Sequence, residues 1–437
     1  MAAVLAPLLT EKDEAESAEG GIDPLGLYTI ADTLGVRLIP GVRERQTHPR
    51  FLTAIAASLA VCGDLGDEAV ASDGVSEPWQ VFEWYLVEGL ARTSEPAETV
   101  GLPGGQKAAK AIADRVPMSA NRYLKTPSVF GFHGIYRLLA RTLGIEQGGR
   151  LGDVGFELLN VWSKEQGLEG FVGTAGGPGQ AVRRQLREAV EAGLEKGGTA
   201  RSGGWSGWEF FHQHLGLYNV GQREAAFIAL KLRADNKGFR GRVLDFLISS
   251  SGRKLWGAEQ SEREFHSGLR KGSNDELPQL LSAIDSYERF SRLCQDAFDD
   301  CLCEMTRKRG KTSPVELGHL RAVKLAQERV PEIFSDVLNR LEPVGQSARL
   351  QDMFGDLTER CAAEEWATRL IDHHRRIQRL KPPDGKNPWI EQFDDGAFVV
   401  RPLYRRDEPG RRDPGYQHAY RTYSLWSFAR DLRLISP

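Results

Sequence analysis

The chain has 437 residues, of which 41% are hydrophobic and 27% are charged, and its formal net charge is −3. This length predicts two or three domains, and the composition is typical of a globular protein rather than a disordered or fibrous one. The longest apolar run, residues 51–62, is shorter than the roughly 20 residues that a transmembrane helix needs. The five cysteines are sparse and odd in number, which favours a reducing, cytoplasmic location without a membrane segment.

Charge is distributed unevenly along the chain. Residues 1–100 contain 6 lysines and arginines against 17 acidic residues, whereas residues 366–437 contain 14 against 9. Residues 11–23 are acidic and lack aromatic side chains, so we expect residues 1–23 to form a disordered leader. A basic chain end favours contact with a polyanion, and a merely solvated basic surface is the structural alternative.

The first half of the chain reads as helices joined by short turns. Apolar residues at spacings of three and four predict a helix over residues 25–38, and a second helix is predicted over residues 49–61 after a basic turn. Within residues 101–160, tight glycine turns separate short helices, as in a helix-turn-helix unit, although such trios are also common packing elements. We therefore predict an N-terminal helical domain over residues 24–195, ended by a Gly- and Ser-rich linker at residues 196–207.

The second half contains the strongest helical pattern. Apolar residues advance by three or four from residue 276 to residue 307, which predicts one helix about 48 Å long in a second helical domain, residues 208–365. Residues 396–404 read as a strand with a possible partner at residues 420–423. The fold class is therefore mainly α, a multi-subdomain helical protein with a small α+β C-terminal appendage, the basic and aromatic-rich module at residues 366–437.

No motif in the sequence predicts a catalytic residue, a metal ligand or a cofactor. The Gly-rich stretch at residues 173–180 lacks the Lys-Ser/Thr ending of a P-loop. Cys294 and Cys301 fall on the apolar stripe of the long helix, where cysteine acts as a small hydrophobic residue. The pair His373-His374 lies in a predicted helix and not on the β-hairpin that an HNH nuclease requires.

The C-terminal module supplies the candidate site. Basic residues are interleaved there with aromatic ones, and this composition suits nucleic acid because cations neutralise phosphates while flat rings stack on bases. The alternative is a solvated basic surface whose rings pack the appendage. The candidate nucleic-acid-binding residues are His374, Arg375, Lys381, Lys386, Trp389, Arg401, Tyr404, Arg405, Arg406, Arg411, Arg412 and Arg421.

Two stretches carry a family resemblance. The opening DPLGLYTIADTLGVRLIPGVRERQTHPRFLTAIAASLAVC and the tail HHRRIQRLKPPDGKNPW, VVRPLY and HAYRTYSLWSFARDL resemble uncharacterised bacterial proteins encoded in anti-phage defence islands. The resemblance implies a setting in defence against foreign DNA, alongside other proteins of the same system. It implies no catalytic residues.

Three functional hypotheses follow. The leading one is an accessory subunit of a bacterial anti-phage defence system that binds nucleic acid or a partner protein. The second is a metal-dependent nuclease whose acidic residues and histidines meet only in the folded chain. The third is a scaffold that oligomerises through the long helix. A continuous basic groove would favour the first, a cleft of carboxylates or histidines the second, and an exposed apolar face on the long helix the third.

Overall fold

A computed structural model describes residues 23–66, 68–174, 176–234, 238–272, 276–382, 384–411 and 415–435, without the side chains of residues 258 and 259. The structure is 64% helical, and its described strands form two small two-stranded sheets. The predicted mainly α fold with a small α+β region near the C-terminus is confirmed. Of the predicted acidic leader, all but Asp23 lies outside the described residues. No described helix is both long enough and apolar enough to cross a membrane.

The chain divides into two compact units, and each is built from segments distant in sequence. Unit 1 contains the described residues up to Gly35 together with Leu255–Tyr420, and unit 2 contains Val36–Lys254 and the described residues from Arg421 onward. The chain crosses between the units within α1 (Tyr28–Leu38), within α12 (Ser250–Glu259) and after Tyr420.

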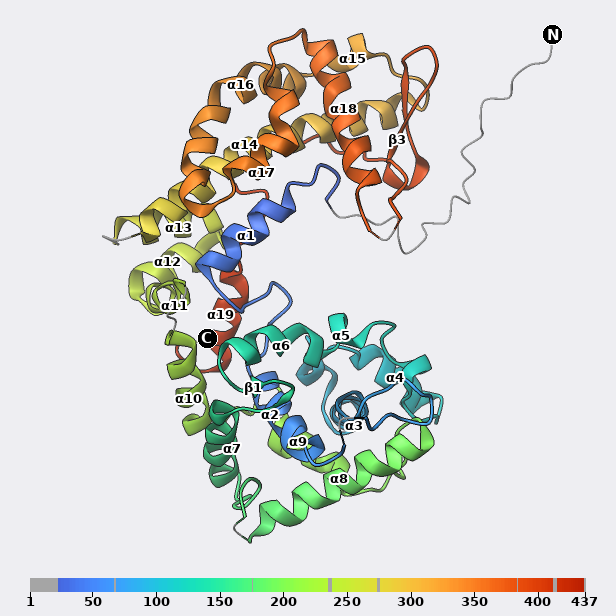
Figure 1. The fold of residues 1–437 in the computed structure, drawn as a ribbon, viewed down its shortest axis with the longest axis vertical. Coiled ribbons are helices and arrows are strands. Elements are labelled where there is room, and N and C mark those ends of the chain that lie inside the picture. The colour runs from blue at the N-terminus through green and yellow to red at the C-terminus, as the bar shows by residue number, and fades with distance from the viewer. Residues whose placement is uncertain are drawn as a thin grey trace, which may run out of the picture. The chain divides into compact units, whose positions relative to one another are not determined.

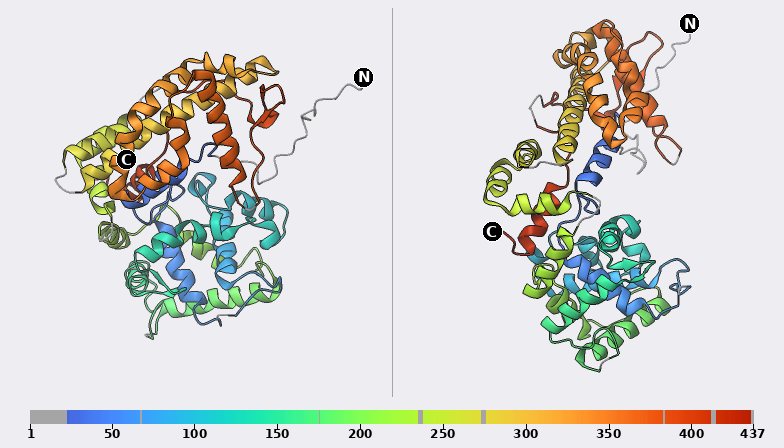
Figure 2. Two further views of the ribbon diagram at one scale, coloured as in Figure 1. Left: turned by 45° about the horizontal axis from the view of Figure 1, so that its top comes forward. Right: turned by 60° about the vertical axis from the view of Figure 1, so that its left-hand side comes forward.

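Unit 2 is a group of helices around the almost wholly buried α2 (Figure 1). Its elements are α2 (Arg50–Cys62), α3 (Pro78–Thr93), η1 (Pro96–Thr99), α4 (Gly105–Ala113), η2 (Ala120–Arg122), α5 (Pro127–Phe130), α6 (Phe132–Thr142), β1 (Glu146–Gln147), β2 (Arg150–Leu151), α7 (Asp153–Glu165), α8 (Pro178–Lys196), α9 (Gly207–Leu215), α10 (Gln222–Arg233), α11 (Arg240–Ile248) and α19 (Thr422–Asp431). Helix α2 is buried on nearly all sides, which is typical of a central helix, and it contacts α3, α6, α7 and α8. In the additional views α8 runs along the outside of this unit (Figure 2).

The predicted linker at residues 196–207 lies inside unit 2 and is fixed there. The backbone N–H of Thr199 donates to the Met118 carbonyl at 2.9 Å, and that of Ala200 donates to the Tyr85 hydroxyl at 2.8 Å. Trp205 and Trp208 pack edge to face at 5.1 Å, and both contact the Tyr85 ring. The glycine and serine content thus marks a surface loop that is pinned by hydrogen bonds, and the boundary between the units falls elsewhere.

Unit 1 is organised by its long helix. Its further elements are α13 (Glu262–Lys271), α14 (Leu277–Lys308), α15 (Pro314–Gly318), α16 (Arg321–Leu341), η3 (Glu342–Val344), α17 (Ser347–Phe354), η4 (Gly355–Thr358), α18 (Ala363–Arg379), β3 (Ile390–Gln392), β4 (Phe398–Val400) and η5 (Pro402–Tyr404). Helix α14 confirms the predicted helix to within one residue at each end, and it packs lengthwise against α16 (Figure 1). Its apolar stripe is buried, including Phe290, Cys294 and Phe298.

The strand predicted at residues 396–404 is real but shorter, and its predicted partner is wrong. Strand β4 pairs antiparallel with β3, with Ile390 opposite Val400, and Phe398 also bridges to Thr312. Residues 420–423 form no strand, because α19 begins at Thr422 and belongs to unit 2. The 366–437 segment is therefore not one module, since its last helix packs against α11.

Candidate functional site

Within unit 1 the described part of the basic tail, residues 404–411 and 415–420, is held against α14 by carboxylates. Arg406 forms an ion pair with Asp299 at 3.1 Å, and its backbone N–H donates to the Thr306 hydroxyl at 2.9 Å. Gly410 donates its N–H to the buried Asp300 at 3.0 Å. Burial raises the pKa of Asp299, and the Arg406 guanidinium acts in the opposite direction. Arg406 therefore has an intramolecular role, and we no longer count it among the candidate phosphate-binding residues.

Further along the tail, a buried carboxylate gathers several donors. Glu288 accepts hydrogen bonds from the backbone N–H of His418 at 3.2 Å and from the Tyr420 hydroxyl at 2.6 Å. The His418 Nδ1 also lies 2.7 Å from Glu288 Oε1, the oxygen that accepts from Tyr420. The Arg292 guanidinium donates to the carbonyl of Tyr416 at 3.1 Å. Because these contacts are buried or half-buried, they tie the end of the tail to α14.

The histidine pair on α18, His373 and His374, binds the N-terminal segment of unit 1 through hydrogen bonds, and we call it the histidine clasp. His373 donates from Nε2 to the Leu25 carbonyl at 2.8 Å, and its Nδ1 accepts from Arg376 at 3.2 Å. His374 donates from Nδ1 to the Pro24 carbonyl at 2.8 Å, while its Nε2 accepts the Trp389 N–H at 2.9 Å. Each ring thus needs one protonated and one unprotonated nitrogen, and burial lowers the pKa of both to about 4. His374 is fully buried, which removes it from the candidate nucleic-acid contacts.

Two of the predicted arginines are also buried. Arg401, at the end of the β3–β4 hairpin, is 5% exposed, and Arg421, which precedes α19, is 3% exposed. The sequence could not distinguish them from surface arginines, because only long-range packing covers their stems. Their burial excludes direct contact with a nucleic-acid backbone in this conformation, and Arg421 belongs to unit 2.

Two further basic residues are engaged within unit 1. Arg375 pairs with Asp372 at 3.1 Å and donates to the Gln392 side chain at 2.6 Å. Lys381 donates to the Asp23 carbonyl at 2.7 Å, and partial burial lowers the pKa of its ammonium group. These contacts hold α18 to the β3–β4 hairpin and to the N-terminal segment.

The remaining candidates are Lys386, Trp389, Tyr404, Arg405 and Arg411. Arg405 and Arg411 are exposed, and Lys386, Trp389 and Tyr404 are half-buried. Arg412 lies outside the described residues. We call Lys386, Trp389, Tyr404, Arg405 and Arg411 the tail surface.

The centre of the tail surface is a parallel aromatic pair. The rings of Trp389 and Tyr404 stack with 4.7 Å between centroids and 4° between planes. The hairpin sets this geometry, since Arg401 donates its N–H to the Trp389 carbonyl at 2.9 Å and the η5 turn then brings Tyr404 back over the indole. Trp389 also lies 6.0 Å from the buried Phe298 ring, so the pair is anchored in the core of unit 1.

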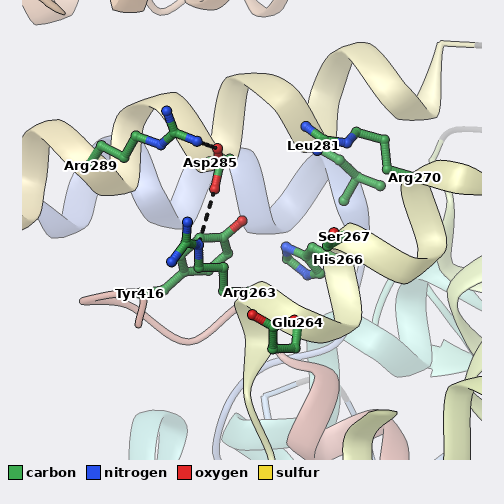
Figure 3. Close-up of a pocket in the computed structure, with 9 residues that line it drawn as sticks. All are labelled: Arg263, Glu264, His266, Ser267, Arg270, Leu281, Asp285, Arg289 and Tyr416. Atoms are coloured by element: carbon green, nitrogen blue, oxygen red, sulfur yellow. Dashed lines mark hydrogen bonds and ion pairs between the residues drawn. The ribbon is translucent and has the colours of Figure 1, made fainter. Parts of the chain in front are cut away.

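A second cluster of charge, which the sequence analysis missed, lies between α13 and the first half of α14. A cavity of about 170 Å³ is lined there by Arg263, Glu264, His266, Ser267, Arg270, Leu281, Asp285, Arg289 and Tyr416 (Figure 3). The sequence did contain an indication of this cluster: the basic residues 263, 266 and 270 are three and four positions apart and therefore share one face of a helix. We call this cavity the arginine pocket.

Among the described residues no group of three or more histidine, cysteine, aspartate or glutamate side chains is arranged to hold a metal ion. Comparison of the chain with protein-family models, with curated proteins and with solved structures found no match.

Proposed function

We propose that this protein is an accessory component of a bacterial anti-phage defence system that binds single-stranded nucleic acid through the tail surface. The setting rests on the resemblance of both chain ends to proteins of defence islands. The observation that carries the binding proposal is the parallel stack of Trp389 and Tyr404 beside the exposed Arg405.

Stacked, half-exposed rings next to cations suit an unpaired strand. Base stacking on an aromatic ring tolerates any sequence because every base has a π face, and neighbouring arginines neutralise the phosphates. Trp389 contacts the buried Phe298 ring, so the pair would be presented without reorganisation. Double-stranded nucleic acid keeps its bases paired and offers the rings no free face.

The salt dependence of binding tests the cationic part of the proposal. The double variant Arg405→Ala/Arg411→Ala should lower the slope of log affinity against log salt by about 1.4, because each lost contact with a single strand removes about 0.7. Fluorescence anisotropy with a labelled oligonucleotide at several salt concentrations measures this slope. The matched control Arg321→Ala/Lys324→Ala removes two exposed cations from α16 and should leave the slope unchanged. An unchanged slope in the tail variant, or no binding by the parent at moderate salt, would make the tail surface a docking site for another protein of the system.

The ring pair gives a separate prediction. Tyr404→Ala should weaken single-strand binding by about 1–3 kcal/mol, because that is the usual contribution of one stacked base. Tyr404→Phe keeps the ring and should bind like the parent. Anisotropy and melting temperature are measured together for both variants. If Tyr404→Ala binds as tightly as the parent while melting earlier, Tyr404 only packs the hairpin and stacking on a base is refuted.

A further inference from the structure

The arginine pocket is small and positively charged. Three arginines, Arg263 and Arg270 on α13 and Arg289 on α14, line it together with two carboxylates, Glu264 on α13 and Asp285 on α14 (Figure 3). Sites for whole organic ligands usually enclose about 300–1,000 Å³, so a cavity of about 170 Å³ suits a single functional group. The excess of cations makes that group an anion.

The arginines are held in place before any ligand arrives. Asp285 lies 2.7 Å from the Arg289 guanidinium and 3.7 Å from that of Arg263, so one carboxylate restrains two long side chains (Figure 3). Restraint of this kind reduces the conformational entropy lost when a ligand binds. Arg270 is exposed and has no ion-pair partner within the described part of unit 1, so its charge remains to be neutralised.

His266 provides a second, independent indication of a ligand. Its ring centroid lies 5.6 Å from the ring centroids of both Tyr416 and Tyr420, and its side chain is 1% exposed. Neither ring nitrogen has a hydrogen-bond partner among the described residues, although Nε2 approaches Glu262 Oε2 at 3.3 Å without hydrogen-bond geometry. Buried polar groups are nearly always hydrogen-bonded, so a missing partner at the wall of a charged cavity marks a place for one.

We propose that the arginine pocket binds a phosphate monoester group. Guanidinium groups donate paired N–H bonds to anionic oxygens, and a tetrahedral phosphate offers three terminal oxygens to donors that converge from different directions. A planar carboxylate is satisfied by one arginine and would leave the other cations unused. Arg270 would supply the uncompensated charge, Arg263 and Arg289 the restrained donors, and His266 a donor from the buried side.

The same phosphate chemistry has two possible sources, a small phosphorylated metabolite or the terminal phosphate of a nucleic acid. Binding to the full chain is measured by titration calorimetry with inorganic phosphate, with adenosine 5′-monophosphate, and with one oligonucleotide carrying either a 5′-phosphate or a 5′-hydroxyl. If the 5′-phosphate increases the affinity for the oligonucleotide and this increase is lost in Arg270→Gln, the ligand is the terminal phosphate of a nucleic acid. Binding of the small phosphates with no such gain identifies the metabolite, and both results support the proposal.

The variant Arg270→Gln tests the pocket without touching its packed walls. It should weaken phosphate binding about tenfold or more, because a hydrogen bond between charged partners is lost. The control Lys271→Gln removes the neighbouring exposed cation on α13, which does not line the cavity, and should bind like the parent. The ¹⁵N resonances of the His266 ring should shift when phosphate is added to the parent and stay unchanged in Arg270→Gln. Absence of phosphate binding by the parent at low salt, or full binding by Arg270→Gln, overturns the proposal. The tail variant Arg405→Ala/Arg411→Ala should retain phosphate binding, so the two proposals fail separately.

Discussion

Replacing Arg50 with methionine should lower the free energy of unfolding by about 3–5 kcal/mol, because it leaves the buried carboxylate of Glu224 without its cation. Both side chains are completely buried, Arg50 on α2 and Glu224 on α10, and they form a direct ion pair. Arg50 also donates to the carbonyls of Gly216 at 3.2 Å and Asn219 at 2.6 Å. Since small domains are stable by only about 5–15 kcal/mol, a loss of this size should be visible in unit 2 as a lower denaturation midpoint.

A double variant and a variant in a surface ion pair distinguish the cost of an unpaired buried charge from a general loss of packing. Arg50→Met/Glu224→Leu removes both charges and should recover part of the loss, because an apolar pair needs no compensating charge. The control Arg233→Met breaks the ion pair with Asp245, whose members are 35% and 59% exposed, and should cost at most about 1 kcal/mol. A cost for Arg50→Met no greater than that of the control would show that the buried pair contributes little. Urea titration followed by circular dichroism measures all three variants.

Acidification should weaken unit 1 between about pH 6.5 and pH 4 through the histidine clasp. Burial lowers the pKa of His373 and His374 from 6.5 to about 4. Between these two pH values each ring is neutral in the folded chain and takes up a proton when the chain unfolds. A depressed histidine pKa contributes stability that is present above the unfolded value and is lost as the pH falls towards the folded value. From pH 7.5 to pH 5 each histidine should reduce the free energy of unfolding by about 2 kcal/mol, or about 4 kcal/mol together.

The hydrogen bonds explain why the folded state resists protonation. Nδ1 of His373 accepts from Arg376 and Nε2 of His374 accepts from the Trp389 N–H, so an added proton would face a donor in each case. The double variant His373→Gln/His374→Gln should therefore show a flatter dependence of stability on pH, by up to about 1.4 kcal/mol per pH unit for each histidine. Replacement of the exposed His319 is the control. Hydrogen exchange in α18 at several pH values locates the effect, and a pH dependence identical to that of the parent would refute it.

Local sequence patterns predicted the helices well, because the spacing of apolar residues within a helix reflects which of its faces is buried. The three- and four-residue spacing over residues 276–307 predicted α14, and the helix predicted over residues 49–61 matches α2 to within one residue at each end. Such a spacing depends only on which side of a helix meets water, and that preference is readable within a few turns. The strand at Phe398–Val400 was also found, but its partner was not, because strand pairing joins segments that the period of two cannot identify.

The candidate site was predictable only as a composition. The sequence by itself determined a mainly helical chain, an acidic first hundred residues and a basic, aromatic tail. Only the tertiary structure decided which tail residues reach solvent, since Asp299 lies 107 positions from Arg406 and the N-terminal segment meets His373 across 348 positions. The tertiary structure also places Tyr416 beside the arginines of α13 and α14, and it places the last helix in unit 2. A charge counts as a surface charge only after every carboxylate and carbonyl that can reach it is known, and those partners are set by long-range packing rather than by neighbours in sequence.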